Sequence, residues 1–168
     1  MTVAVSQEYP LYDGVAPSWS DVQTTIHVSG GETVVDIDYA GFKFGTVVEV
    51  GEQRGASGGR LMKRTTGSKK DTLSATYYKS GLRKLLRALM AVAPQRGNQR
   101  LVSLVHFDIQ TLHTPPGADG IYEQTARGCR LLKIDGGWTE GNEAEKVELE
   151  FSPAEIYFAI DSVEVVLL

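Results

Sequence analysis

The chain has 168 residues, 42% hydrophobic and 23% charged, an ordinary composition for one soluble globular domain over residues 1–168 that excludes wholesale disorder. Its single cysteine, Cys129, excludes an intrachain disulfide framework and a cysteine-rich zinc site. The formal net charge of −4 does not suggest a general nucleic-acid binder. Because no secretory signal or membrane-spanning apolar run is evident, we expect folding in the cytoplasm and no membrane partner.

Residues 1–39 are predicted to form an extended arm followed by a β-hairpin. Residues 1–20 show little periodicity and contain Pro10 and Pro17, which favours an extended N-terminal arm. Two alternating runs follow on either side of the turn Ser29-Gly30-Gly31. One face of the first run carries Val22, Thr24, Ile26 and Val28; in the second, Thr33, Val35, Ile37 and Tyr39 share an apolar face, and Asp36 and Asp38 take the other.

The next segment is interrupted by glycine and positive charge. Phe42–Val50 predicts a third strand and Thr72–Tyr78 another, with Leu73, Ala75 and Tyr77 on one face. Between them, residues 52–70 hold four glycines and predict a long basic loop, with at most a short strand at Leu61–Thr66. The six bases of this loop are Arg54, Arg60, Lys63, Arg64, Lys69 and Lys70.

One amphipathic helix is predicted over Ser80–Ala93. Ser80 is the expected N-cap, and Pro94 ends the helix. Its apolar stripe contains Leu82, Leu85, Leu86, Leu89, Met90 and Ala93, and Arg83, Lys84 and Arg87 take the opposite face.

The rest of the chain reads as strands separated by turns. We expect eight or nine strands in all, which together with the one helix favours a mainly β protein, a sandwich or barrel with one packed helix. The strands expected here are Leu101–Gln110, Arg127–Asp135, Glu143–Phe151, Ile156–Ile160 and Val163–Leu168, with a loop over residues 114–120.

A search for catalytic, metal-binding and cofactor-binding chemistry gives only isolated residues, so we expect no enzyme, no metal and no cofactor. His106 and Asp108 share a strand face, as do the two carboxylate pairs Asp36/Asp38 and Glu148/Glu150, but alternation places polar residues this way in any half-buried strand. Cys129 lacks a Cys–His signature. The loop Gly55–Arg60 lacks the spacing of a phosphate-binding loop.

Charge is distributed along the chain in three blocks. Residues 1–51 carry a net −6, residues 52–100 a net +10 and residues 101–168 a net −8. A basic middle between two acidic ends suggests electrostatic complementarity, within the fold or between copies of it. Together with the arm, the basic loop and the absence of a catalytic constellation, this pattern favours an assembly module.

The order of features resembles bacteriophage tail tube proteins and the related secretion-system tube proteins. The likeness covers about two-thirds of the chain. It is carried by Arg64-Thr65-Thr66-Gly67 with the strand Thr72–Tyr78, by the helix Ser80–Ala93, and by Gly128-Cys129-Arg130-Leu131-Leu132, Gly141–Phe151 and Ile156-Tyr157-Phe158.

This resemblance implies a structural virion protein of the tail, assembled in the host cytoplasm. Six subunits would form a ring, and stacked rings a hollow tube through which DNA is ejected without specific binding. Tape measure and terminator proteins would be partners. The implied lumen-facing candidates are Asp36, Asp38, Glu148 and Glu150, because carboxylates repel DNA phosphates. We further expect the six bases of the loop 52–70 to contact a neighbouring copy, and the loop to become ordered there.

Three other functions fit the same sequence. The chain could be another tail component, a terminator or a baseplate tube-like protein. It could be a monomeric β-sandwich that binds carbohydrate through Trp19 and Trp138, since exposed tryptophans stack on sugars. It could also be a small hydrolase that uses an Asp or Glu pair.

Overall fold

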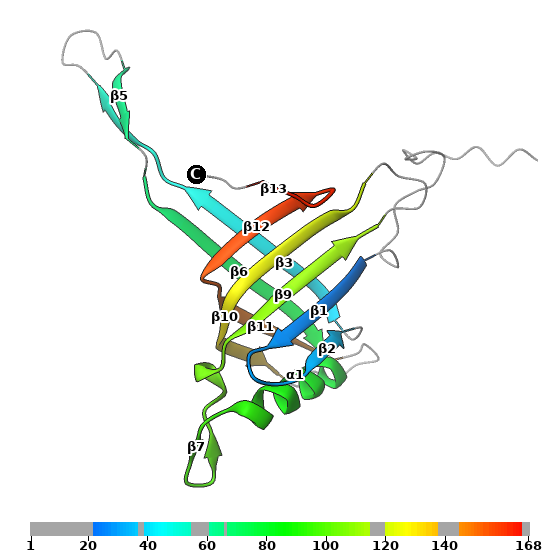
Figure 1. Cartoon of the computed structure of the whole chain (residues 1–168). Coiled ribbons are helices and arrows are strands. Elements are labelled where there is room, and N and C mark those ends of the chain that lie inside the picture. Colours follow the sequence, from blue (N-terminus) through cyan, green and yellow to red (C-terminus); the bar gives the residue numbers. More distant parts are fainter. Residues whose placement is uncertain are drawn as a thin grey trace, which may run out of the picture.

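The chain folds into a mainly β structure with one α-helix (Figure 1), which confirms the predicted fold class. The computed structural model describes residues 22–36, 39–54, 61–65, 67–114, 120–137 and 145–165, so the arm predicted for residues 1–20 lies outside the described residues. The elements are β1 (Val22–Val28), β2 (Thr33–Asp36), β3 (Tyr39–Val48), β4 (Gly51–Arg54), β5 (Leu61–Thr65), β6 (Lys69–Tyr78), α1 (Lys79–Val92), β7 (Gln95–Arg96), β8 (Gln99–Arg100), the 3₁₀ turn η2 (Val102–Leu104), β9 (Phe107–His113), β10 (Tyr122–Gly136), β11 (Lys146–Ser152), β12 (Glu155–Ile160) and β13 (Val163–Val165).

Nine strands form one folded sheet of two layers. The first layer runs β2-β1-β9-β10-β12-β13 and the second runs β10-β11-β6-β3, so that β10 belongs to both. Figure 1 shows the strands of the first layer crossing those of the second. Within the described residues no ladder joins β2 to β3, so the sheet is sandwich-like and does not close into a barrel.

A β-bulge lets β10 pass from one layer to the other. The pairing of β10 with β9 shifts between Ala126 and Cys129, and Gly128 there has a φ of 60°. This left-handed conformation is one that glycine adopts at little cost. The Gly128 N–H donates to the Asp108 carboxylate at 2.8 Å, which holds the bulge against β9. The sequence predicted only the strand Arg127–Asp135, because a bulge interrupts the alternation in the longer element.

The predicted N-terminal hairpin is confirmed, but the face assigned to its second strand is wrong. Ile26 pairs with Val34 and His27 with Thr33. Val34 packs against the core, whereas Thr33 is exposed on the same side as His27. The turn sets the register of a hairpin, and a slip by one residue moves every side chain to the other face.

The core lies between the two layers and beneath α1. Its most enclosed side chains come from both layers and from the helix: Ile26, Tyr77, Leu85, Leu89, Phe107, Ile109, Leu149 and Ile156. The buried Thr24 hydroxyl donates to the Tyr39 hydroxyl at 2.9 Å, so this polar pair is satisfied and ties β1 to β3.

The helix is confirmed, with two corrections. It begins at Lys79 after Tyr78, without a side-chain cap, so Ser80 is not the N-cap. The strand β6 leads directly into it, so the N-cap position is Tyr78, two residues earlier than the capping pattern indicates. Met90 is 41% exposed, whereas Ala88 is fully buried, so the apolar stripe is rotated toward Ala88.

The strand predicted over Leu101–Gln110 is also wrong at its start. Residues 95–100 form the hairpin β7–β8, η2 follows, and the strand β9 begins only at Phe107. The apolar residues Leu101, Val102 and Leu104 belong to the 3₁₀ turn and the residue before it. A short apolar run in the sequence does not distinguish such a turn from a strand. The strands expected from residues 143–168 are confirmed as β11, β12 and β13 within the described residues.

Candidate assembly surfaces

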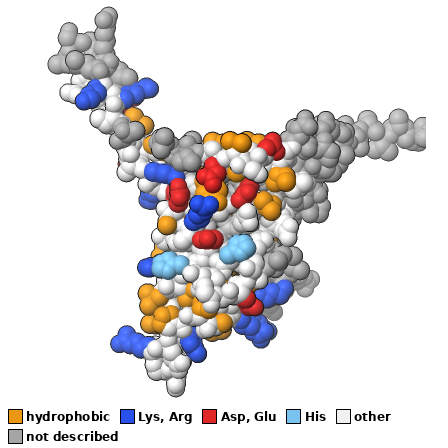
Figure 2. All heavy atoms as spheres, in the orientation of Figure 1, with side chains coloured by type: hydrophobic (Ala, Val, Ile, Leu, Met, Phe, Trp, Pro, Cys, Tyr) orange, Lys and Arg blue, Asp and Glu red, His pale blue; other side chains and the backbone are white. Residues whose placement is uncertain are grey.

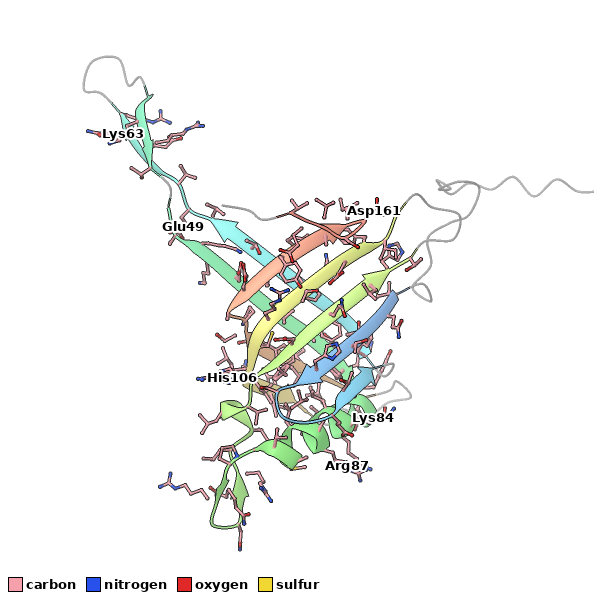
Figure 3. All side chains as sticks on the ribbon, in the orientation of Figure 1. Glu49, Lys63, Lys84, Arg87, His106 and Asp161 are labelled. Atoms are coloured by element: carbon pink, nitrogen blue, oxygen red, sulfur yellow. The ribbon has the colours of Figure 1, made fainter. Side chains whose placement is uncertain are left out.

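A basic hairpin projects from one end of the body. β4 and β5 pair antiparallel beyond the ends of β3 and β6 (Figures 1 and 3), so the long loop predicted over residues 52–70 is in part a paired hairpin. The Glu52 carboxylate contacts Arg54 at 3.1 Å and Arg64 at 3.5 Å. The pair Glu52–Arg64 joins directly opposite residues of the two strands and favours the ladder where composition indicated a loop, whereas Arg54 contacts Glu52 within β4. Arg54, Lys63 and Arg64 are exposed.

The base of the hairpin depends on a close backbone approach. The Glu49 N–H donates to the Ser68 carbonyl at 3.0 Å, which joins the end of β3 to the start of β6. A Cβ placed on Gly67 would lie 1.1 Å from the Glu49 carbonyl oxygen. The segment that ends β3 and the segment that begins β6 can therefore approach each other this closely only because residue 67 is glycine.

The remaining loop bases lie elsewhere. Lys69 and Lys70 belong to β6, and Arg60 lies outside the described residues. The Lys69 ammonium pairs with the Asp71 carboxylate at 3.4 Å and donates to the Ile156 carbonyl at 3.3 Å. The Ile156 N–H donates to the same carboxylate at 3.0 Å. Lys69 therefore holds β6 against β12 within one subunit, and Lys70 is exposed opposite Val47.

Glu148 and Glu150 are exposed on the outer face of the second layer. Glu150 stands between Lys133 and Ser74, and Glu148 between Asp135 and Thr76. The pKa of Lys133 is raised by its hydrogen bond to the Asp135 carboxylate and by the charges of Asp135, Glu150 and Glu148. This face therefore mixes the carboxylates of Glu148, Glu150 and Asp135 with the exposed cations Lys133, Lys43 and Lys146. A shallow hollow beside them runs across β3, β6 and β11.

The other two acidic candidates lie away from this face. Asp36 is in β2, opposite Thr24 at the edge of the first layer. Asp38 lies outside the described residues. β2 and β11 are separated by β1, β9 and β10 in the sheet, so Asp36 and the pair Glu148/Glu150 belong to different layers.

The outer face of the first layer carries acidic, basic and histidine side chains close together (Figure 2). The Arg127 guanidinium lies 4.4 Å from the centre of the Tyr157 ring and donates to its hydroxyl at 2.8 Å. His106 accepts a hydrogen bond from Arg130 at 2.8 Å and does not pair with Asp108, whose carboxylate holds the bulge. His106 and Asp108, which the sequence placed on one strand face, therefore bind different partners and do not form a His–Asp pair.

Other chemistry is absent from the described part of the chain. No group of three or more His, Cys, Asp or Glu side chains there could hold a metal ion. No helix in the same residues has the length and hydrophobicity of a membrane span. Trp19 and Trp138, the candidates for sugar stacking, both lie outside the described residues, as does the glycine-rich segment 55–60.

A second basic hairpin was missed from the sequence. Gly97, with a φ of 60°, and Asn98 turn β7 into β8, and this hairpin projects from the body on a different side from β4–β5 (Figure 1). Arg96 and Arg100 are exposed on it. A Gly-Asn pair is a hairpin signal, but the flanking residues do not alternate, so the signal was not recognised. Both projections are basic, and neither can pair with the other.

Three strands lie at open edges of the sheet. Within the described residues β2, β3 and β13 each pair on one side only. The strand β3 has ten residues, and exposed apolar side chains, Val47 and Val50, lie near the base of the projecting hairpin. Long unpaired edges are a liability in a monomer and are usually covered in an assembly.

Comparison with known proteins identifies the fold. No protein-family model and no curated protein matches the chain. A chain of the anti-feeding prophage baseplate, in a six-fold symmetrised cryo-EM structure, superposes with a TM-score of 0.60 at 11% identity, over 86% of this chain and 96% of its own.

Two further structures match over a greater share of the chain. A chain in the tube-terminating cap of the anti-feeding prophage has a TM-score of 0.58 at 9% identity, over 95% of this chain and 99% of its own. A chain in the extended sheath–tube complex of the PVC extracellular contractile injection system has a TM-score of 0.56 at 13% identity, with the same coverage. These matches confirm, at the level of the fold, the resemblance to tail tube proteins.

Proposed function

We propose that this chain is a structural, non-enzymatic subunit of a tail-like tube. The observation that carries the proposal is the shared fold over nearly the whole of both chains, in particles that the structures describe as baseplate, tube-terminating cap and sheath–tube complex. Tube, terminator and baseplate tube-like subunits are all compatible with this fold. The absence of a metal cluster among the described residues is compatible with an assembly role as well.

The surfaces of the subunit support assembly with further copies. Ring closure would pair the open edges of β3, β2 and β13, which removes their unsatisfied backbone groups from solvent. Head-to-tail stacking repeats one heterologous contact along a filament. Because both projecting hairpins are basic, the β4–β5 hairpin needs an acidic surface on the next copy, and the block of residues 101–168 supplies one.

The finer features of the proposal follow the tail tube resemblance. Rings would contain six copies, and the face with Glu148 and Glu150 would line the lumen, with Asp36 and Asp38 as further candidates. Carboxylates there would let a polyanion such as DNA pass without sticking. Tape measure and terminator proteins would be the partners in a virion-like particle.

Assembly is tested first on the purified chain. Sedimentation velocity over a range of concentrations, with negative-stain electron microscopy of the same samples, is expected to show rings or tubes. A species that remains monomeric at high concentration and shows no rings on grids contradicts the tube proposal. Such a result would instead favour a monomeric β-sandwich module.

The role of the basic hairpin is tested by charge reversal. The double variant Lys63→Glu/Arg64→Glu is expected to keep a folded body, because both side chains are exposed and the ion pair that is lost, Arg64 with Glu52, lies within the projecting hairpin, but to form no stacked rings. The matched control is Arg83→Glu/Arg87→Glu on the exposed face of α1, which changes the charge by the same amount and is expected to stack. Stacking of the wild type should also weaken in high salt. Long tubes from the hairpin variant at ordinary salt would show that this hairpin is not the contact between rings.

A further inference from the structure

The inner face of the first layer continues beyond the core as an exposed apolar surface. Along β12, Ile156 is 2% exposed and lies in the core, whereas Ile160, on the same face, is 51% exposed. Side chains two apart on a strand point to the same side of a sheet, so Phe158 belongs to this surface as well. The surface therefore begins where the second layer ceases to cover the first.

The apolar patch spans three neighbouring strands. Tyr122, Ile160 and Val163 form one row of paired residues, and Phe158 and Val165 form the next on the same face. The rings of Tyr122 and Phe158 stack at 6.5 Å. Tyr122 is 38% exposed, Val163 66% and Val165 45%. We call these five side chains the apolar patch.

The patch is held rigidly at its corner. The Ile121 N–H donates to the Asp161 carboxylate at 3.0 Å, and the Asp161 N–H donates to the Ile121 carbonyl at 3.1 Å. These two bonds tie the turn between β12 and β13 to the start of β10, where Figure 3 labels Asp161. In Figure 1 the adjacent ends of β9, β10 and β12 extend past β3 and β6. The apolar patch is therefore preformed: Phe158 packs against the core at its inner margin, and Tyr122, Ile160, Val163 and Val165 are left exposed by the described residues.

The N-terminal segment, residues 1–21, leaves the fold beside this patch. Val22, the first residue of β1, pairs with His113, and His113 pairs with Tyr122 of the patch. Four strand spacings of about 4.8 Å separate β1 from β13, a span of roughly 19 Å. About six extended residues cover that distance. The chain can therefore reach all of the patch from its own point of exit, without a second copy.

The composition of this segment matches an apolar partner that lies extended. Pro10 and Pro17 favour an extended backbone and remove two N–H donors that would otherwise need partners. Between and beside them the segment carries large apolar side chains: Tyr9, Leu11, Tyr12, Val15 and Trp19. Trp19 is three residues from Val22, which is within reach of the nearest row of the patch.

We propose that the N-terminal segment of the same chain docks on the apolar patch, with Trp19 among the side chains that cover it. The docked segment shields from water a surface that the sandwich itself leaves open. This contact is independent of whether the chain forms a tube.

Tryptophan fluorescence tests the contact. The chain has two tryptophans, so Trp138→Phe leaves Trp19 as the only one. In this variant the emission of Trp19 is expected to be blue-shifted and protected from acrylamide. Adding Val163→Lys should shift the emission to the red and raise the quenching constant several-fold, because a charge then interrupts the patch. Leu132→Lys is the matched control, since Leu132 is also 66% exposed but lies on β10 outside the patch.

Each outcome decides the proposal. Far-ultraviolet circular dichroism checks that the lysine variants fold, which is expected because both positions are exposed. Emission typical of solvent-exposed tryptophan before the lysine change, or no response to Val163→Lys, overturns the proposal. A red shift on dilution overturns docking within the chain and indicates that a second copy provides the segment.

Discussion

Cys129 is fully enclosed at the point where β10 changes layer. Burial, followed by the negative charge of Asp108, raises the pKa of its thiol from 9.0 to about 12. A thiol in this state is neutral and unreactive at physiological pH, although Arg130 is its neighbour in the sequence. The buried structural role is therefore the one that the geometry supports.

The stability of the fold should consequently depend on Cys129 at high pH. The unfolded chain releases the thiol proton near pH 9.0, whereas the folded chain retains it to about pH 12. The contribution is thus fully present below pH 9 and is lost as pH rises, by up to about 1.4 kcal/mol per unit.

Denaturant unfolding from pH 8 to pH 10.5 measures this contribution. The free energy of unfolding of the wild type is expected to fall more steeply with pH than that of Cys129→Ala. Comparison with this variant removes the effect of lysines and tyrosines that titrate in the same range. Parallel pH profiles for the two proteins would contradict the raised pKa of Cys129.

At the scale of elements, two neighbouring apolar residues of α1 differ in burial. Leu89 is fully buried, whereas Met90 is 41% exposed. Leu89→Ala is expected to lower the free energy of unfolding by about 2–5 kcal/mol, and Met90→Ala by less than about 1 kcal/mol. Chemical denaturation of both variants measures the difference. Equal losses would mean that Met90 packs as the sequence pattern predicted.

The projecting hairpin depends on Gly67 at its base. An alanine Cβ there would collide with the Glu49 carbonyl, so Gly67→Ala must shift the backbone. We expect the Glu49 amide, which donates to Ser68, to exchange its hydrogen faster in the variant, with little change in the core amides. Gly41→Ala is the control, because nothing lies within 4 Å of a Cβ at Gly41. Unchanged protection of Glu49 would show that the close approach is not required.

For the molecule as a whole, the carboxylates Glu148 and Glu150 on the outer face of the second layer are expected to contribute little to folding, and in the proposed tube they would face the lumen. Glu148→Gln/Glu150→Gln should change the free energy of unfolding by no more than about 0.5 kcal/mol, because both side chains are exposed. Rings and tubes should still form. The pKa of Lys133 should fall, since both carboxylates contribute to raising it. Thermal unfolding and electron microscopy check the first two points, and loss of assembly would place this face at a contact between subunits.

The two basic hairpins and the acidic flanks define the polarity that the proposed assembly would use. The β4–β5 hairpin extends the ladder of β3 and β6, and the β7–β8 hairpin follows the end of α1. The charge pattern predicted that residues 52–100 are basic, but not that they project from the body as two separate hairpins. The positions of the charge blocks in space depend on which strands pair. Lys69, although part of the basic block, therefore binds the Ile156 carbonyl within the same subunit.

The sequence by itself determined the class of fold and most of its elements. Alternation in β1, β6, β11 and β12 and the three- and four-residue spacing in α1 are local patterns, because each is a consequence of burying one side of a strand or helix. The basic character of the β4–β5 segment was also evident from composition alone.

Only the tertiary structure decided the register and the long-range contacts. The face of β2 follows from the turn before it, and the division of β10 between two layers follows from the bulge at Gly128. Lys69 and Asp71 meet Ile156 across separations of 87 and 85 residues. Such contacts arise when the two layers pack together, and no pattern within either segment records the identity of the distant partner.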